Sequence, residues 1–381
     1  MNPKVKKLLV PLKRQHQGGK IFALLLLLVT VAMLVMACGA APAAAPAQSQ
    51  QPASSGAEEK PAAESASKPE QAPAAEMDKV TLRLSWRWKA EFAPLVLTAD
   101  KGFFKEQNIE VELLEGKGSG DVVPLIGNKS DDFGYLNLTT VAIAIGKGLP
   151  VKVVAGLMEK NPSALAFFAD KNIKEPKDLE GKSIALAPGE AFAVIYPSFA
   201  AKWEIDTNKV QAIQLDPAAK NQAFLEGKID VLPVYVNNEL PQIRALSDKP
   251  IDILVPGDWG FNTLANGIIV HEDTIRENPD LVRRFVTAVI NGYKYSLEHP
   301  DEAVDAVTKR SEELASQPRD ILLDQVKMTL DFIHSPATKD NPIGWMAEED
   351  WKSTLTPLYE SKAIEQELPL DTYYTNEFVP Q

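Results

Sequence analysis

Cysteine is almost absent from this 381-residue sequence, which contains only Cys38. A single cysteine excludes an internal disulfide and any metal site built from several thiolates, so stability has to come from a buried core. Positive charge is also in deficit, because 40 Lys and Arg residues face 52 Asp and Glu residues, for a net charge of -12. Nucleic-acid binding needs clustered Lys and Arg, and the composition argues against it.

Catalytic signatures are missing as well. The sequence has no G-x-S-x-G elbow, no H-E-x-x-H helix and no G-x-x-x-x-G-K-[ST] phosphate loop. Its four histidines lie far apart in the chain and are more typical of surface positions than of a ligand set: His16, His271, His299 and His334. We therefore predict no enzyme, with no catalytic residues, no metal site and no cofactor.

The N-terminal segment differs from the rest. Several lysines and Arg14 precede an apolar run from Ile21 to Met36, which is short for a membrane span and typical of an export signal. The run ends in Val-Met-Ala-Cys-Gly at 35–39, which resembles a bacterial lipobox. This resemblance implies a signal peptide over 1–37, a lipid on Cys38, and location at the extracytoplasmic face of the cell membrane. An uncleaved membrane anchor is the alternative, and it would hold the same body on the same surface.

The following segment is poor in core-forming residues. Residues 39–75 consist mainly of Ala, Pro, Gln, Ser, Glu and Lys and contain no aromatic side chain. Such a composition cannot bury enough apolar surface to offset the entropy of ordering the chain. We predict a disordered tether over 38–77.

Strands and helices then alternate to the end of the chain. An alternating strand at 80–86, a helix at 92–104 and a strand at 109–114 make a β-α-β unit, the element of a parallel sheet covered by helices. A second series of such units begins near Ser183, and Asn278-Pro279 opens a long amphipathic helix over 280–297. We therefore predict an α/β protein of two lobes, each a mainly parallel sheet flanked by helices. Lobe 1 is assigned to 78–168 plus 266–381, and lobe 2 to 169–265.

Ligands of open α/β sheets bind at the carboxyl ends of the strands, so aromatic and polar residues there are candidates. Trp86 and Trp88 stand at the end of the first strand and, two residues apart, should point to the same side of the sheet. Together with Phe92 just beyond, they would form an aromatic wall. Core packing is the alternative for either indole. Asn137, Thr139 and Glu190 stand at later strand-to-helix junctions, where helix capping is the alternative.

A last group follows the strands of the second lobe. Neighbouring rings and amides suit a flat heterocycle, since rings stack and amides bond its edge. A turn with a packed indole is the alternative. These candidates are Tyr235, Asn237, Glu239, Trp259 and Asn262.

Several motifs together resemble those of one family. They are Glu-Phe-Ala-Pro at 91–94, Ala-Asp-Lys-Gly-Phe-Phe at 99–104, the glycine-rich turn at 116–120 and Asn-Pro-Asp-Leu-Val-Arg-Arg-Phe at 278–285. The sequence resembles the periplasmic solute-binding proteins that serve importers of thiamine-precursor pyrimidines, riboflavin, sulfonates and nitrate. The resemblance implies a type II clamshell fold, a small-molecule ligand, and partnership with an ABC permease and, through it, an ATPase.

The family leaves several ligands open. Thiamine-precursor binders usually follow the first strand with Trp and then Pro, Asn and His. Here Trp86 is present, but the segment 87–92 that follows it lacks the Pro, the Asn and the His. Sulfonate and nitrate need positive charge or donors, whereas the candidates include Glu190 and Glu239. We therefore expect a vitamin-type heterocycle, with riboflavin first, a pyrimidine precursor second, and a sulfonate or nitrate third. A pyrimidine-synthase-like enzyme and a surface adhesin or chaperone are the other classes.

Overall fold

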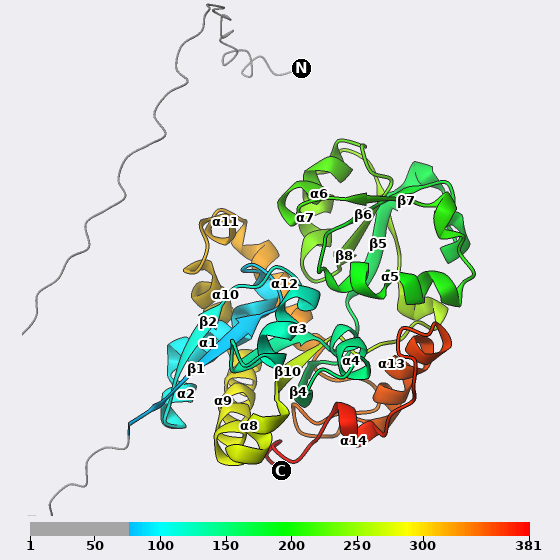
Figure 1. Cartoon of the computed structure of the whole chain (residues 1–381). Coiled ribbons are helices and arrows are strands. Elements are labelled where there is room, and N and C mark those ends of the chain that lie inside the picture. Colours follow the sequence, from blue (N-terminus) through cyan, green and yellow to red (C-terminus); the bar gives the residue numbers. More distant parts are fainter. Residues whose placement is uncertain (1–75) are drawn as a thin grey trace, which may run out of the picture. The chain divides into compact units, whose positions relative to one another are not determined.

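The computed structural model describes residues 76–381, and two five-stranded sheets form its framework (Figure 1). The predicted signal peptide, Cys38 and almost all of the predicted tether lie outside the described residues. The first sheet has the order β2-β1-β3-β10-β4. Its strands are β1 (Asp78–Leu84), β2 (Ile109–Leu114), β3 (Phe133–Asn137), β4 (Val151–Met158) and β10 (Asn266–His271).

The second sheet repeats this arrangement with the order β7-β6-β8-β5-β9. Its strands are β5 (Ser163–Phe168), β6 (Ser183–Leu186), β7 (Gln211–Gln214), β8 (Val231–Tyr235) and β9 (Ile251–Leu254). In each sheet the fourth strand, β10 or β5, runs antiparallel to both of its neighbours, and the other pairings are parallel. The predicted α/β fold of two mainly parallel lobes is confirmed.

The antiparallel strands follow the two crossings between the lobes. Strand β5 pairs with β8 and β9 of the second sheet, although the sequence-based boundary assigned residues up to 168 to lobe 1. The first crossing therefore lies at residues 159–162, just before β5. An apolar run such as Ser163–Phe168 has the same pattern whichever sheet it joins, so only its partners reveal the lobe.

Helices cover both faces of each sheet. In the second lobe, α6 and α7 lie on one side of the strands and α5 on the other (Figure 1). The α-helices of the first half are α1 (Ala93–Lys101), α2 (Phe103–Glu106), α3 (Ser119–Gly127), α4 (Leu138–Gly146), α5 (Ala191–Lys202), α6 (Pro217–Leu225) and α7 (Glu239–Leu246). Those of the second half are α8 (Glu272–Glu277), α9 (Pro279–Glu298), α10 (Pro300–Thr308), α11 (Glu312–Ala315), α12 (Arg319–Asp331), α13 (Glu348–Glu360) and α14 (Leu370–Tyr373).

Short 3-10 helices occupy several of the connections. They are η1 (Ala90–Phe92), η2 (Ala169–Lys171), η3 (Pro176–Leu179), η4 (Thr207–Lys209) and η5 (Pro256–Trp259). Within residues 76–381, no helix combines the length and apolar character that crossing a bilayer requires.

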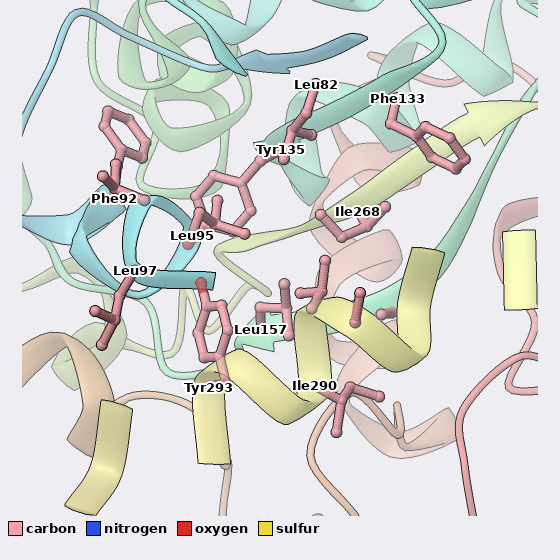
Figure 2. Close-up of a cluster of buried hydrophobic side chains, with 14 of the residues drawn as sticks. Leu82, Phe92, Leu95, Leu97, Phe133, Tyr135, Leu157, Ile268, Ile290 and Tyr293 are labelled. Carbon is pink, nitrogen blue, oxygen red and sulfur yellow. The ribbon is translucent and has the colours of Figure 1, made fainter. Parts of the chain in front are cut away.

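The long helix α9 supports the first sheet. It begins at Pro279 after Asn278, whose side chain accepts a hydrogen bond from the Leu281 N–H, as the Asn-Pro pair predicted. Its inner face meets the sheet in an apolar core (Figure 2). The rings of Phe285 and Phe133 stack there with centroids 3.7 Å apart, and both are fully buried. This packing fixes the start of β3 against α9.

Replacing Phe285 by Ala should lower the free energy of unfolding by about 3–5 kcal/mol, because the change removes buried surface and leaves a cavity. Chemical denaturation followed by circular dichroism measures this loss. Leu297→Ala is the matched control on the same helix, since Leu297 is 48% exposed, and it should change stability by about 0.5 kcal/mol or less. Equal losses for the two variants would contradict the packing role of Phe285.

Candidate functional site

A cavity lies between the two lobes at the carboxyl ends of their strands. Side chains of both lobes line it: Ser85, Trp86, Lys89, Glu91, Ser119, Ser163, Ala164, Glu190, Ala191, Phe192, Pro233, Val234, Tyr235, Asn238 and Glu239. We call it the cleft cavity. Most of these residues lie at the end of β8, follow β1 or β6, or open α3, α5 or α7, while Ser163 and Ala164 begin the antiparallel strand β5. The carboxyl ends of parallel strands from both sheets therefore converge there.

The cleft cavity is small. Its volume is about 60 Å³, while one water molecule in the liquid occupies about 30 Å³. Two domains joined by two crossings can open and close by hinge motion, which changes the size of such a space.

Two glycine turns hold the lobes together at one end of the cleft. The Gly120 N–H, at the start of α3, donates to the Gly189 carbonyl of the second lobe over 3.0 Å. A Cβ atom on Gly118, whose φ is +144°, would lie 2.2 Å from the same carbonyl oxygen. Only a residue without a side chain permits this approach, so the predicted glycine-rich turn is a contact between the lobes.

Glu91 and Asn238 meet across the cleft. Glu91 belongs to η1 in the first lobe, Asn238 precedes α7 in the second, and the Asn238 amide donates to the Glu91 carboxyl. Both side chains are 3% exposed. Burial, and next the nearby Glu239, raise the pKa of Glu91 to about 8. Near neutral pH the Glu91 carboxyl is therefore largely protonated and uncharged.

The other carboxylates of the cavity are bonded within the second lobe. Glu190 forms an ion pair with Lys220, which is 3% exposed and also donates to the Pro233 carbonyl over 3.2 Å. Glu239 accepts a hydrogen bond of 3.0 Å from the Tyr235 N–H. The lining also holds the cation of Lys89, but the carboxylates of Glu190 and Glu239 outnumber it, which does not favour an anionic ligand.

Beside the cavity lies a group of buried polar atoms without hydrogen-bond partners. The hydroxyls of Tyr135 on β3 and Tyr293 on α9 point toward one another (Figure 2). Burial raises the pKa of both tyrosines, and the charge of the nearby Glu91 carboxyl raises each pKa further when that carboxyl is ionised. The remaining atoms are Asn237 Oδ1, Asn238 Oδ1, both side-chain atoms of Asn266, and Gln325 Oε1. Buried polar groups are normally bonded, so this cluster has capacity for a polar ligand edge or water.

Comparison with known proteins identifies the family. Residues 89–303 match the model of the NMT1/THI5-like family. The chain belongs to this family. It is 29% identical over 310 residues to the riboflavin-binding protein RibY of Chloroflexus aurantiacus, covering 80% of this chain and 87% of that protein. Over 79% of this chain and 92% of the other, it is 23% identical to the 4-amino-5-hydroxymethyl-2-methylpyrimidine phosphate synthase of Legionella pneumophila.

Solved structures agree on the fold. The alkanesulfonate-binding protein SsuA of Xanthomonas axonopodis superposes with a TM-score of 0.61 at 13% identity, over 79% of this chain and 99% of that one. At this identity the likeness shows the periplasmic-binding-protein fold alone. The family and the fold implied by the sequence motifs are therefore confirmed, and the ligand is left to the chemistry of the cleft.

In this family member the structure brings together four of the side chains proposed from the sequence, namely Trp86, Glu190, Tyr235 and Glu239. Asn137 lies next to them, buried, where it caps α4 by accepting from the Thr140 N–H and stands beside Tyr235. Capping and proximity to the cleft, the two interpretations open for Asn137, thus occur together.

Thr139 and Asn237 are buried near the cleft but bond elsewhere. The Thr139 hydroxyl donates to the Leu264 carbonyl over 3.1 Å, which fixes α4 to the second crossing. The Asn237 amide donates to the Thr329 hydroxyl of α12 over 2.8 Å. Both residues join separate segments, and neither lines the cleft cavity.

The aromatic wall is narrower than expected. Phe92 is fully buried in the core of the first lobe, edge-on to Tyr135 with centroids 5.9 Å apart. Trp88 packs partly against the same core, and its backbone N–H donates to the Glu115 carboxylate over 2.8 Å. The strand ends at Leu84, so the alternation that would place Trp86 and Trp88 on one face does not continue. Phe192 of α5 joins Trp86 and Tyr235 as the third ring of the cavity instead.

Trp259 and Asn262 lie away from the cleft cavity. Trp259 is 41% exposed in η5, and Asn262 lines a different cavity beside the second crossing. Both follow β9, but this strand is at the edge of its sheet, far from the switch between β6 and β8. Position after a strand was therefore an insufficient guide for these two residues.

The sequence-based set also missed residues of the site. Glu91, Asn238, Lys89 and Ser119 line the cavity. A signal existed for Glu91, which opens the Glu-Phe-Ala-Pro motif just before an apolar helix. An acidic residue placed there has no core function, and its burial was visible only in three dimensions.

Replacing Gly118 by Ala should hold the lobes apart, because the new methyl group collides with the Gly189 carbonyl oxygen. Energy transfer between dyes on Ala245→Cys in α7 and Lys294→Cys in α9, in a Cys38→Ser chain, measures the separation. Gly181→Ala is the control, since Gly181 also has a positive φ, +80°, but no atom within 4 Å of its Cβ position. A separation unchanged by Gly118→Ala would contradict this role for the glycine turns.

Proposed function

We propose that the chain is the solute-binding component of an ABC importer and that its ligand is riboflavin. The observation that carries the proposal is the composition of the cleft cavity, in which Trp86, Phe192 and Tyr235 accompany the neutral donors and acceptors of Asn238 and Glu91. Rings offer stacking surface to a flat heterocycle, and amides bond its edge. Similarity to RibY of Chloroflexus aurantiacus supports the same ligand class.

Binding follows a cycle of opening and closing. With the lobes apart, a ligand ring contacts Trp86 of the first lobe. Closure then brings Phe192 and Tyr235 of the second lobe against it, and removal of apolar surface from water supplies most of the free energy. The buried polar cluster around Asn238 gains partners at the same moment. A closed body of fixed shape then docks on the permease, which an ATPase drives.

The proposal includes the place of action. The apolar segment before Cys38 would direct export, and a lipid on that cysteine would then hold the body at the outer face of the membrane, next to the permease. In intact cells, the wild-type chain should carry a diacylglyceryl group detectable by mass spectrometry of its N-terminal peptide. Cys38→Ser should abolish that modification and accumulate uncleaved precursor. An unmodified Cys38 in the wild type would contradict the anchor.

A synthase of the kind found in Legionella pneumophila is the second candidate, because that relative covers most of the chain. None of the histidines among residues 76–381 lines the cleft cavity, and no group of acidic, histidine or cysteine side chains in that range can hold a metal ion. The lining therefore offers binding groups and no histidine. Formation of a pyrimidine phosphate by the purified chain would revive this candidate.

Riboflavin should bind the purified full-length chain in detergent with quenching of flavin fluorescence and a raised melting temperature, since a ligand that binds only the folded state stabilises it. Trp86→Ala should weaken the affinity by on the order of tenfold to a hundredfold through the lost ring contact. Trp259→Ala is the control, because this indole is 41% exposed and outside the cavity, and it should leave the affinity unchanged.

The same titration separates the competing ligands. A formylated aminopyrimidine, taurine and nitrate are tested beside riboflavin under identical conditions. Binding of taurine or nitrate without riboflavin would contradict the proposal, because the cleft offers little positive charge to an anion. Binding of the pyrimidine alone would keep the importer and change its cargo.

A further inference from the structure

The contact between Glu91 and Asn238 is unusual because it joins the lobes through an acidic side chain that has almost no access to water. Glu91 is 3% exposed, and its bonded neighbour is an amide rather than a cation. A buried carboxylate without a cationic partner is strongly disfavoured, whereas the protonated carboxylic acid is not. The closed arrangement therefore selects the neutral form of Glu91.

The groups around Glu91 favour the same form on balance, because burial and Glu239 outweigh the Asn238 hydrogen bond and Lys89. Glu239 at the start of α7 adds a second negative charge, and Lys89 before η1 has the weakest of the influences on Glu91. Tyr135 on β3, Tyr235 on β8 and Tyr293 on α9 also face the carboxyl.

The helices packed on η1 add no charge at this point. From α12, the side chains that reach the contact are Gln325 and Thr329, which bond the second-lobe residues Asn238 and Asn237 and do not titrate. The buried residues of α10 are Ala and Val, and those of α1 are uncharged. None of these three helices therefore supplies a cation that would keep the Glu91 carboxyl ionised.

A protonated Glu91 also needs an acceptor for its hydrogen. Asn238 Oδ1 is buried and has no partner, on the same amide that already contacts the carboxyl. A carboxylic acid and an amide can exchange two hydrogen bonds, one in each direction, when the acid carries its proton. The ionised carboxylate could use only the amide N–H, and Asn238 Oδ1 would stay unbonded.

We propose that the Glu91 carboxyl takes up one proton from water each time the two lobes close, so that ligand capture is coupled to pH. This inference rests on the proposed function, because closure is the step that captures the ligand. The proposal requires that the carboxyl reaches solvent when the lobes are apart and then releases its proton to water at neutral pH. No other group has to change in the step.

The direction of the coupling follows from the two states. Closure raises the pKa of Glu91 from an ordinary value near 4.5 to about 8. Closure is therefore most favourable at a pH below 4.5, the ordinary pKa. This gain in free energy is lost as the pH rises from about 5 to about 8. Over this window one proton is bound per closure, so the affinity should fall about tenfold for each pH unit. Above about pH 8 the affinity should be constant.

Calorimetric titration of the full-length chain with riboflavin, from pH 5 to 9, tests the coupling. Two buffers of different ionisation enthalpy at each pH count the protons, and we expect uptake approaching one between pH 5.5 and 7.5. Glu91→Gln should bind with an affinity independent of pH, because its amide keeps the contact with Asn238 without a titrating group. Glu313→Gln, the same change at an exposed position of α11, should keep the wild-type slope.

Two results would overturn the inference while leaving riboflavin as the ligand. One is strong binding with no proton uptake in the wild type, a measurement that needs no variant. The other is an unchanged slope in folded Glu91→Gln.

If riboflavin does not bind at any pH, the proposed ligand is wrong, and the inference is tested without it. Energy transfer between the dyes on Ala245→Cys and Lys294→Cys, in the Cys38→Ser chain, then reports lobe separation against pH. Lobes that approach as the pH falls from 8 to 5, and fail to do so with Glu91→Gln, would support the coupling. A separation independent of pH would overturn it.

Discussion

The structure depends on burying polar side chains where two lobes meet. The Asn238 amide of the second lobe donates to the Glu91 carboxyl of the first, and each is 3% exposed. Such a contact is favourable only when every polar atom is bonded and no charge is left alone, because the surroundings have a low dielectric constant. Unbonded atoms on Asn266 and Gln325 show that closure without a ligand satisfies this condition incompletely. A ligand with polar edges would bond these buried atoms and lower the free energy of the closed form. Ligand recognition and lobe closure are connected in this way.

The two sheets make this contact possible. Each places parallel strands so that their carboxyl ends face the other lobe, and each is completed by one antiparallel strand that arrives from a crossing. Apolar cores on both faces of the sheets support the strands, as the Phe133–Phe285 stack does at the start of β3 in the first lobe. Rigid lobes and short crossings concentrate movement at the hinge, so the cleft changes volume while its walls keep their shape.

Much of the fold could be predicted from the sequence, and less of the site. The spacing of apolar residues and the Asn278-Pro279 pair predicted α9 closely, since caps and periodicity act locally. The lobe of β5 could not be predicted, because pairing with β8 and β9 is a long-range choice. Similarly, Trp86 and Tyr235 were found as residues after strands, whereas Phe92 turned into the core and Trp259 into solvent. Direction of a side chain beyond a strand end depends on the turn that follows, and one sequence does not specify it.

The cleft also explains why family membership alone does not give the ligand. Relatives of this chain include a riboflavin-binding protein and a pyrimidine phosphate synthase on what is one family fold. Differences in ligand within the family therefore have to arise from a few side chains around the cleft. Here these are Trp86, Phe192, Tyr235 and the Glu91–Asn238 contact, which together suit an uncharged ring system better than an anion.

The central claim is that a flat, uncharged ligand is held between strand ends of both lobes. Hydrogen exchange of backbone amides, measured by mass spectrometry with and without riboflavin, tests it most directly. The account predicts slower exchange in 85–92 of the first lobe and, at the same time, in 188–193 and 233–240 of the second. Protection confined to one lobe, or found only around 256–262 beside the second crossing, would contradict it.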